Sequence, residues 1–316
     1  MNGILNVLKP PGMTSHDVVN FVRRTLSVAR AGHTGTLDPG ASGVLVVCLG
    51  SATKIVRFLM DGKEYRAEIT FGISTATGDV FGEVTKRSDA SSITLEKLEE
   101  TLSLFRGDIL QIPPMTSAIK MGGKKLYELA RRGIEVERQP RPVKIYSLRV
   151  LGGQGWGTPH PKALLSISCS GGTYVRALCA DIGEKLGCGA HMSFLVRTKV
   201  GTLSIDGSVT LEEIASLASK NNIDSEIIGI DEVLNFLPEV QLKRGAVIPA
   251  ASGSLVYPPG VISSLPGISP GSLVRLKFRE QLIAIARAVP YGDTVDVLYK
   301  PLCVLSGGPV FFKQSS

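Results

Sequence analysis

One stretch of the chain combines a lone carboxylate with a glycine-rich backbone. Residues 32–43 read GHTGTLDPGASG, and Asp38 is the only acid among them. The β-branched apolar run that follows, residues 44–50, predicts a buried strand. Because glycine lets another molecule approach the backbone closely, a loop anchored on such a strand can present Asp38 to a substrate. The plainer interpretation is a turn, since Asp, Pro and Gly are all common turn formers.

Two further side chains, an aromatic ring and a guanidinium, have chemistry that complements a carboxylate. Tyr65 lies on the apolar face of the alternating residues 64–72, which predict a half-buried strand. On this pattern alone Tyr65 is a core aromatic. Arg176 falls in the first turn of a predicted helix that Thr173 can cap, and it lies off the apolar stripe of that helix. Such a position is typical of a solvated arginine.

The flanking sequence predicts the elements that must position these residues. Thr14 to Asp17 have the spacing of a capping box, with Asp in place of the usual Glu, and predict a helix after them. A second helix is predicted over residues 94–105 by its stripe of leucines. Strands are predicted at residues 4–8, 141–151, 162–170, 272–278 and 281–289.

The composition is that of a soluble globular protein with room for two domains. The chain has 316 residues, of which 43% are hydrophobic and 20% charged. No apolar run approaches the length of a membrane span, and the N-terminus lacks the features of a signal peptide. The five cysteines form no Cys-x-x-Cys pair and are expected to be buried thiols. We therefore expect a cytoplasmic protein that does not engage membranes.

The positive charge of the chain is gathered into three blocks. The net charge is +7, with +6 in residues 106–149, +3 in residues 1–37 and +5 in residues 241–316. The two intervening blocks are negative. This distribution fits a surface that binds nucleic-acid phosphates, although a basic solvated surface gives the same pattern.

Five motifs, in order, resemble the TruB-type family of bacterial tRNA pseudouridine-55 synthases, and the resemblance covers about residues 1–240. The motifs are K-P-x-G-x-x-S from Lys9, GHTGTLDPGASGVL from Gly32, T-x-T-x-D-x-x-G from Thr75, P-P-x-x-S-A-x-K-x-x-G followed by Y-E-L-A-R from Pro113, and G-T-Y-x-R from Gly172.

The resemblance implies a role for each matching side chain. It makes Asp38 the catalytic residue, Arg176 its ion-pair partner, and Tyr65 the ring that stacks on the target uracil. It makes Lys9 a support of the active-site loop, and His33 could fill the space that a flipped base leaves. Two more residues fall at substrate-binding positions, namely Tyr174 and Leu195.

The resemblance also implies the architecture. We expect an α+β pseudouridine-synthase fold over residues 1–238, with a mixed, mostly antiparallel central sheet. A small β domain of the PUA type, which binds RNA, is expected over residues 239–316. An RNA-gripping insertion is expected at about residues 106–140. Its phosphate-binding candidates are Lys120, Lys124, Lys125, Arg131 and Arg132.

The implied reaction isomerises the uridine at position 55 in the T loop of tRNA. It breaks the N1–C1′ bond, turns the base, and joins C5 to C1′, so neither electrons nor phosphoryl groups are transferred. We expect no cofactor and no metal, in keeping with the lack of a nucleotide-binding P-loop or a convincing metal-ligand spacing. The expected partner is the T arm of tRNA, with no obligatory protein partner.

Such chemistry needs an ionised carboxylate near the sugar–base bond, and a base lifted out of the stack onto an aromatic face. An opposite charge such as Arg176 favours the ionised form of Asp38. The sequence leaves open whether Asp38 attacks the sugar, attacks the ring or removes a sugar proton. Two other classes also stay open: an RNA-binding or tRNA-folding protein without chemistry, and a nucleoside hydrolase or glycosylase.

Overall fold

The computed structural model describes residues 1–316 except 118, 131, 265–266, 293–295 and 306–316. A mixed nine-stranded sheet forms its centre. Its main path runs through β1 (Gly3–Lys9), β3 (Ser42–Leu49), β12 (Ala190–Val200), β4 (Lys63–Phe71), β11 (Lys162–Cys169), β10 (Arg141–Gln154) and β7 (Gly107–Gln111). Two short strands, β2 (Ala31–His33) and β13 (Leu203–Ser204), pair with β3 and β12. Among the described strands of this sheet only the β3–β12 pairing is parallel, which confirms the predicted mixed, mostly antiparallel sheet.

Helices cover this sheet. They are α1 (Ser15–Thr25), α2 (Leu95–Ser103), α4 (Val175–Lys185), α5 (Leu211–Ser219) and the short α6 (Ile230–Val233). The predicted apolar faces of α1, α2 and α4 are largely buried, with Leu95 of α2 exposed. The capping box of α1 is present: the Thr14 hydroxyl accepts from the Asp17 backbone N–H, and the Asp17 carboxylate accepts from that of Thr14.

The predicted cap of α4 is wrong. Tyr174 is the N-cap residue and makes no side-chain cap. The Thr173 hydroxyl instead donates to the carbonyl of Ser170 at 2.9 Å, within the turn that precedes the helix. A threonine can satisfy the backbone of such a turn as well as that of a helix end, so its sequence position does not decide between them.

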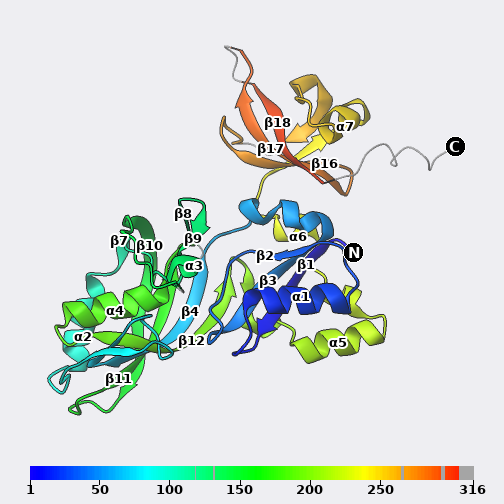
Figure 1. Ribbon diagram of the computed structural model, residues 1–316. Helices are drawn as coiled ribbons and strands as arrows, with labels where there is room; N and C mark the ends of the chain where they lie inside the picture. Colours follow the sequence, from blue (N-terminus) through cyan, green and yellow to red (C-terminus); the bar gives the residue numbers. More distant parts are fainter. Residues whose placement is uncertain (118, 131, 265–266, 293–295, 306–316) are drawn as a thin grey trace.

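The C-terminal part of the chain forms a second, five-stranded sheet. Its order is β15 (Val261–Ser264), β14 (Glu239–Leu242), β16 (Leu273–Phe278), β17 (Gln281–Pro290) and β18 (Val297–Val304), with α7 (Arg244–Ala251) packed against it. In Figure 1 this unit stands above the main sheet, next to α6. Ile285 and Cys303 from it share one apolar cluster with Ile4 and Val46 of the main sheet.

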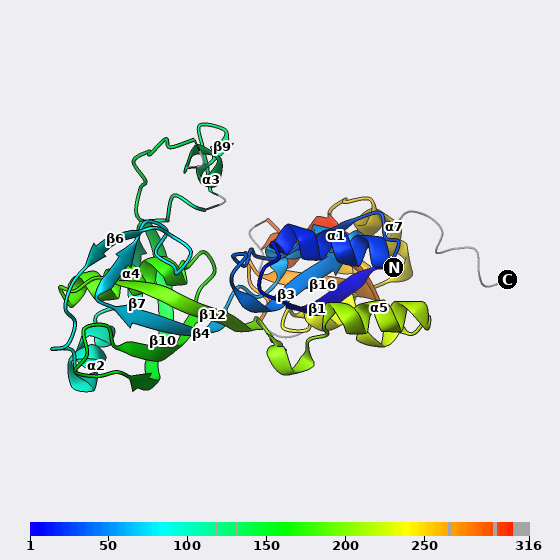
Figure 2. The same cartoon turned by 60° about the horizontal axis from the view of Figure 1, so that its bottom comes forward.

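Two hairpins project from the main body. The first joins β5 (Ile73–Thr75) to β6 (Val84–Arg87). The second joins β8 (Lys120–Met121) to β9 (Lys124–Lys125) through a turn at Gly122 and Gly123, and α3 (Leu126–Ala130) follows it. Figure 2 shows β9 and α3 standing away from the sheet on long connections. The part of the chain between β7 and β10 is therefore an arm rather than a core element.

The described residues include no helix long and apolar enough to cross a lipid bilayer. The five cysteines are free and buried, as the sequence predicts.

Candidate active site

The loop that carries Asp38 runs from β2 to β3, and a buried lysine hydrogen-bonds its backbone. Lys9, the last residue of β1, donates from Nζ to the carbonyls of Pro10 (2.9 Å), Pro39 (3.2 Å) and Ala41 (2.6 Å). Its side chain is fully buried. A buried ammonium with three carbonyl acceptors fixes the backbone on the C-terminal side of Asp38. Lys9, which the resemblance makes a support of this loop, thus bonds the loop backbone directly.

A serine holds the other side of the same loop. The Ser15 hydroxyl accepts from the Leu37 backbone N–H at 2.8 Å and donates to the Leu37 carbonyl at 3.0 Å. Ser15 belongs to the first turn of α1, so the capping box that starts this helix also places the hydroxyl. Sequence reasoning did not assign Ser15 a role in the site. Its signal was the final position of the K-P-x-G-x-x-S motif.

Arg176 and Asp38 form a two-point ion pair. The distance from Arg176 Nε to Asp38 Oδ2 is 2.8 Å, and Nη2 donates to Oδ1 at 3.2 Å. The Arg176 side chain is 5% exposed, whereas that of Asp38 is 36% exposed. Arg176 is therefore not the solvated residue that its place off the apolar stripe suggested. Arg176 thus orients the Asp38 carboxylate from the buried side, and part of that carboxylate remains accessible to solvent.

The same guanidinium joins two more segments to the Asp38 loop. Arg176 Nη1 donates to the Thr77 carbonyl at 3.0 Å and to the Thr116 hydroxyl at 2.6 Å, and it lies 3.5 Å from Asp79 Oδ2. Asp79 is a second carboxylate in the site, and sequence reasoning noted its motif without giving it a role. Because one side chain links three loops, its position depends on all of them.

Tyr65 lies on β4 beneath the Asp38 loop. Its ring belongs to the buried cluster that also contains Leu37 and Ala41. Burial raises the pKa of the Tyr65 phenol to about 12, and Arg197 opposes this rise. The phenol is therefore neutral at physiological pH. The structure makes Tyr65 a core residue, 6% exposed, in the same cluster as two residues of the Asp38 loop.

Arg197 is a buried arginine that sequence reasoning did not single out. It lies on β12 opposite Tyr65 and donates to three carbonyls of the loop region, those of Val44 (2.8 Å), Gly35 (3.0 Å) and Thr36 (3.3 Å). At Gly43, whose φ is 109°, a Cβ atom would collide with the Arg197 backbone. This glycine allows β3 to run close beside β12, so both strands fix the C-terminal end of the loop.

Burial and nearby positive charge lower the pKa values of two groups beside the Asp38 loop, Lys9 and His33. Burial lowers the pKa of Lys9 to about 8; Asp38 opposes this shift and Arg197 adds to it. Burial also lowers the pKa of His33 on β2, and Arg197 and His16 lower it further. Nδ1 of His33 is buried and has no hydrogen-bond partner among the described residues. The loop is thus enclosed by groups whose charges depend on one another.

The two remaining residues expected at the substrate differ in accessibility. The backbone N–H of Tyr174 donates to Gln111 Oε1 at 2.8 Å, and the Tyr174 carbonyl accepts from Gln111 Nε2 at 3.0 Å. The residue is half-buried. It lines a cleft of about 300 Å³ at the base of the arm, together with Pro113 and Gly172. Leu195 is buried on β12, opposite Ala67, within the core that contains Tyr65. It therefore shapes the floor of the site rather than its open surface.

The basic residues of the arm lie on the projecting β8–β9–α3 unit. Lys120, Lys124 and Arg132 are exposed, and Lys125 is half-buried with Nζ 5.4 Å from the centre of the Tyr127 ring. Arg131 lies outside the described residues. Among the described residues, Lys120, Lys124, Lys125 and Arg132 make no ion pair or hydrogen bond with Asp38. The arm that carries them is joined to the site through Thr116, which bonds Arg176.

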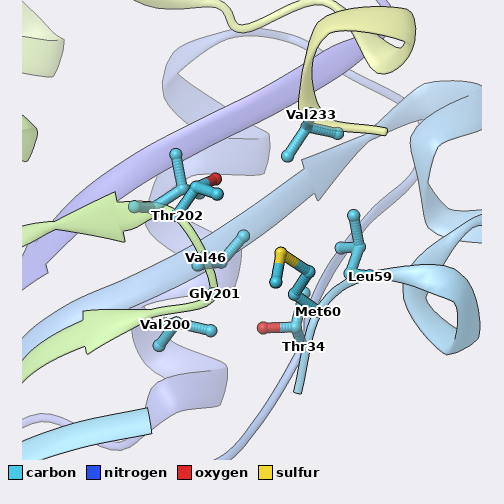
Figure 3. A pocket seen from close by; sticks show the side chains of 9 residues that line it. Thr34, Val46, Leu59, Met60, Val200, Gly201, Thr202 and Val233 are labelled. Carbon is cyan, nitrogen blue, oxygen red and sulfur yellow. The ribbon is translucent and has the colours of Figure 1, made fainter. Parts of the chain in front are cut away.

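A small apolar cavity near the loop is not part of this site. Figure 3 shows it lined by Thr34, Val46, Met60 and Val200, with no charged group among its lining residues. Its volume of about 20 Å³ suits a single water molecule. Among the described residues no three His, Cys, Asp or Glu side chains gather in a way that could hold a metal ion.

Comparison with known proteins gives one consistent result. The family model described as "TruB family pseudouridylate synthase (N terminal domain)" matches residues 23–175. The model "tRNA pseudouridylate synthase B C-terminal domain" matches residues 176–238. The chain is 56% identical over 309 residues to tRNA pseudouridine synthase B of Pelotomaculum thermopropionicum, covering 97% of this chain and 98% of the relative. It is 48% identical over 258 residues to the protein of that name from Alkaliphilus oremlandii, covering 81% and 83%.

Solved structures agree with the sequence relatives. A Cbf5–Nop10–Gar1 complex contains a chain that matches with a TM-score of 0.73 and 30% identity, covering 96% of this chain and 85% of that one. An H/ACA RNP bound to a substrate RNA containing 2′-deoxyuridine matches with the same TM-score at 28% identity, again covering 96% and 85%. Because 96% of this chain is covered, the match extends into the C-terminal β domain.

Proposed function

Because the chain belongs to the TruB family of pseudouridylate synthases, we propose that it isomerises the uridine at position 55 in the T loop of tRNA to pseudouridine. The substrate is inferred from relatives that are named tRNA pseudouridine synthase B and match up to 97% of the chain. The observation that carries the proposal is the ion pair between Arg176 and Asp38, which orients a carboxylate whose outer edge stays open.

In the proposed reaction Asp38 is the anionic group at the sugar–base bond. Arg176 orients the Asp38 carboxylate through the two-point contact from its buried guanidinium. Tyr65 supplies the aromatic face for the flipped uracil, and Leu195 forms the apolar floor beside it. His33 fills the space that the base leaves. Lys9, Ser15 and Arg197 hold the loop, so the carboxylate is preorganised before substrate arrives.

We propose that the basic residues of the arm and of the small β domain bind the T arm of the tRNA. The catalytic domain would comprise residues 1–238, the arm residues 106–140, and the small RNA-binding β domain residues 239–316. Support comes from the exposed cations of the arm and from the sheet change at Glu239, where β14 begins. Replacing Lys120, Lys124 and Arg132 by Ala should weaken tRNA binding and flatten its salt dependence. An unchanged salt slope would mean that these cations do not meet phosphate.

The direct test uses an unmodified tRNA transcript and the purified chain without added cofactor or protein. The expected product is pseudouridine at position 55, with the RNA mass unchanged and the modified site mapped by a pseudouridine-specific chemical label. A tRNA-folding protein would leave the transcript unmodified, and a glycosylase would release free base. Either result would overturn the proposal. Activity of the chain alone would also show that the reaction needs no protein partner.

A further inference from the structure

An exposed aromatic ring stands at the rim of the site and has no part in the chemistry described so far. Phe81 lies in the connection between β5 and β6 and is 77% exposed. Its ring packs against Gly40, two residues beyond Asp38, where Cε2 and Cζ occupy the space that a Cβ atom at Gly40 would need. The ring therefore rests on the Asp38 loop by one edge and presents most of its surface to solvent.

The backbone under Phe81 is fixed by hydrogen bonds on both sides. Its N–H donates to Asp79 Oδ1 at 3.1 Å, and the Val80 N–H donates to the Met192 carbonyl at 3.1 Å. The Met192 N–H in turn donates to the Gly78 carbonyl at 3.0 Å. Since Asp79 also lies 3.5 Å from Arg176, the ring is tied to the network that orients Asp38. The backbone of Phe81 is thus held in place, and its ring lies against Gly40.

Val80, the chain neighbour of Phe81, is also exposed, whereas Phe194 pairs with Glu68 of β4 and so lies on the face of the sheet away from Tyr65. Single exposed apolar residues are ordinary. Phe81 differs because its ring packs on the loop that carries Asp38. An exposed ring in that place, at the edge of a site that accepts RNA, suits the face of a nucleobase.

We propose that Phe81 is a binding residue on which an unpaired base next to the target uridine stacks. This inference rests on the proposed function. The flipped uracil belongs to Tyr65, beneath the Asp38 loop, whereas Phe81 lies on the outer side of that loop and so meets the adjoining nucleotide. The ring has no hydrogen-bonding group, so the contact is indifferent to which base it receives. Stacking there holds the strand in place while the uridine is turned.

The test compares Phe81→Ala with Phe81→Tyr and Phe81→Trp in steady-state pseudouridine formation on a tRNA transcript. Removing the ring should raise KM about tenfold and leave kcat within about threefold, since a base–aromatic stack is worth 1–3 kcal/mol per base. The two aromatic variants should keep KM near wild type. Leu104→Ala, which truncates a comparably exposed apolar residue at the end of α2, is the matched control and should change neither constant.

A second arm removes the partner instead of the ring. Transcripts with an abasic nucleotide on one or the other side of the target uridine are assayed with wild type and Phe81→Ala. With one of these transcripts the wild type should bind more weakly than it binds the intact transcript. Phe81→Ala should bind that transcript no more weakly than it binds the intact one, because the variant has already lost the ring that would stack on the missing base.

The outcomes separate the two proposals. If the wild type makes no pseudouridine, the proposed function fails. If the wild type is active and Phe81→Ala has an unchanged KM, the stacking role is overturned. A loss of kcat that Tyr and Trp do not restore also overturns it, since the ring would then act only by packing on Gly40. Equal melting temperatures of all variants exclude a folding defect as the source of either result.

Discussion

Two buried arginines bridge pairs of carboxylates in this molecule, one at the site and one at the joint between the two sheets. Arg176 contacts Asp38 and Asp79. Arg275, on β16, lies 2.7 Å from Asp231 Oδ1 and 3.9 Å from Glu239 Oε2. Both arginines also bond backbone carbonyls, so both tie together segments that are distant in sequence. The two networks therefore use the same building blocks.

They differ in their balance of charge. At the joint a second cation, Lys277, lies 2.7 Å from Asp231 and 3.3 Å from Glu239, so two positive charges meet two negative ones. Its hydrogen bond to Asp231 raises the pKa of Lys277, so Lys277 stays charged. At the site one guanidinium directly faces two carboxylates. The charges of the joint network balance, whereas the site network has one more carboxylate than cation, although Asp38 and Asp231 are similarly exposed, at 36% and 31%.

The sharpest break of this comparison is Asp38→Asn. Asparagine keeps the shape and the turn preference but cannot act as an anionic nucleophile or base, so turnover should fall by about a thousandfold or more. Melting temperature and tRNA affinity should stay close to wild type. The counterpart Asp231→Asn should keep turnover within about threefold. Asp38→Asn turnover within about tenfold of wild type would show that Asp38 is only a turn residue.

The next largest effect should come from Arg176→Lys. The charge survives, but one ammonium cannot reproduce the two-point contact with Asp38 and the bond to Thr116, so kcat should fall by about a hundredfold. Arg275→Lys loses the same fork at the joint and should lower the melting temperature while leaving kcat near wild type. Similar kcat losses in both variants would mean that the two networks do not differ in function.

A smaller effect should appear with pH, through Lys9. Its pKa is about 8, below its ordinary value of 10.5, and the neutral amine has too few N–H donors for three loop carbonyls. We expect kcat to fall about threefold to tenfold between pH 8 and 9.5. Stability should move the other way, because the unfolded chain binds more protons between pH 8 and 10.5, so the Lys9 contribution rises with pH there.

Pre-steady-state rates measured across this range, together with thermal unfolding, test both signs. Lys9→Arg stays charged throughout and should lack the decline. The same decline in that variant would assign it to another group.

The smallest effect concerns the joint alone. Asp231 is 31% exposed, so Asp231→Ala should cost about 1–2 kcal/mol and lower the melting temperature by about 2–6 °C, without changing kcat. Calorimetry of the full chain gives the shift. A kcat change larger than about threefold would show that the joint transmits its state to the site, and the comparison would need revision.

Much of the local structure follows from the sequence because its causes are local. The capping box at Thr14 and Asp17, the alternation around Tyr65 and the glycine turn at residues 122–123 each depend on neighbours a few residues away. Propensity and periodicity therefore predict them. Asp38 and Arg176 are identified through motifs, and Tyr65 through its place on the strand after the Asp38 motif; such matches mark positions without stating contacts.

Only the tertiary structure decides which of these residues meet, and in what environment. Arg176 reaches Asp38 across 138 residues and Thr116 across 60, and no local pattern encodes those distances. Lys9, Ser15 and Arg197 look like ordinary polar residues in sequence, yet each bonds the loop because the sheet order places β1, α1 and β12 around it. Burial follows from the same packing. It changes an exposed-looking lysine into a group with a pKa of about 8, and a helix-surface arginine into the residue that orients Asp38.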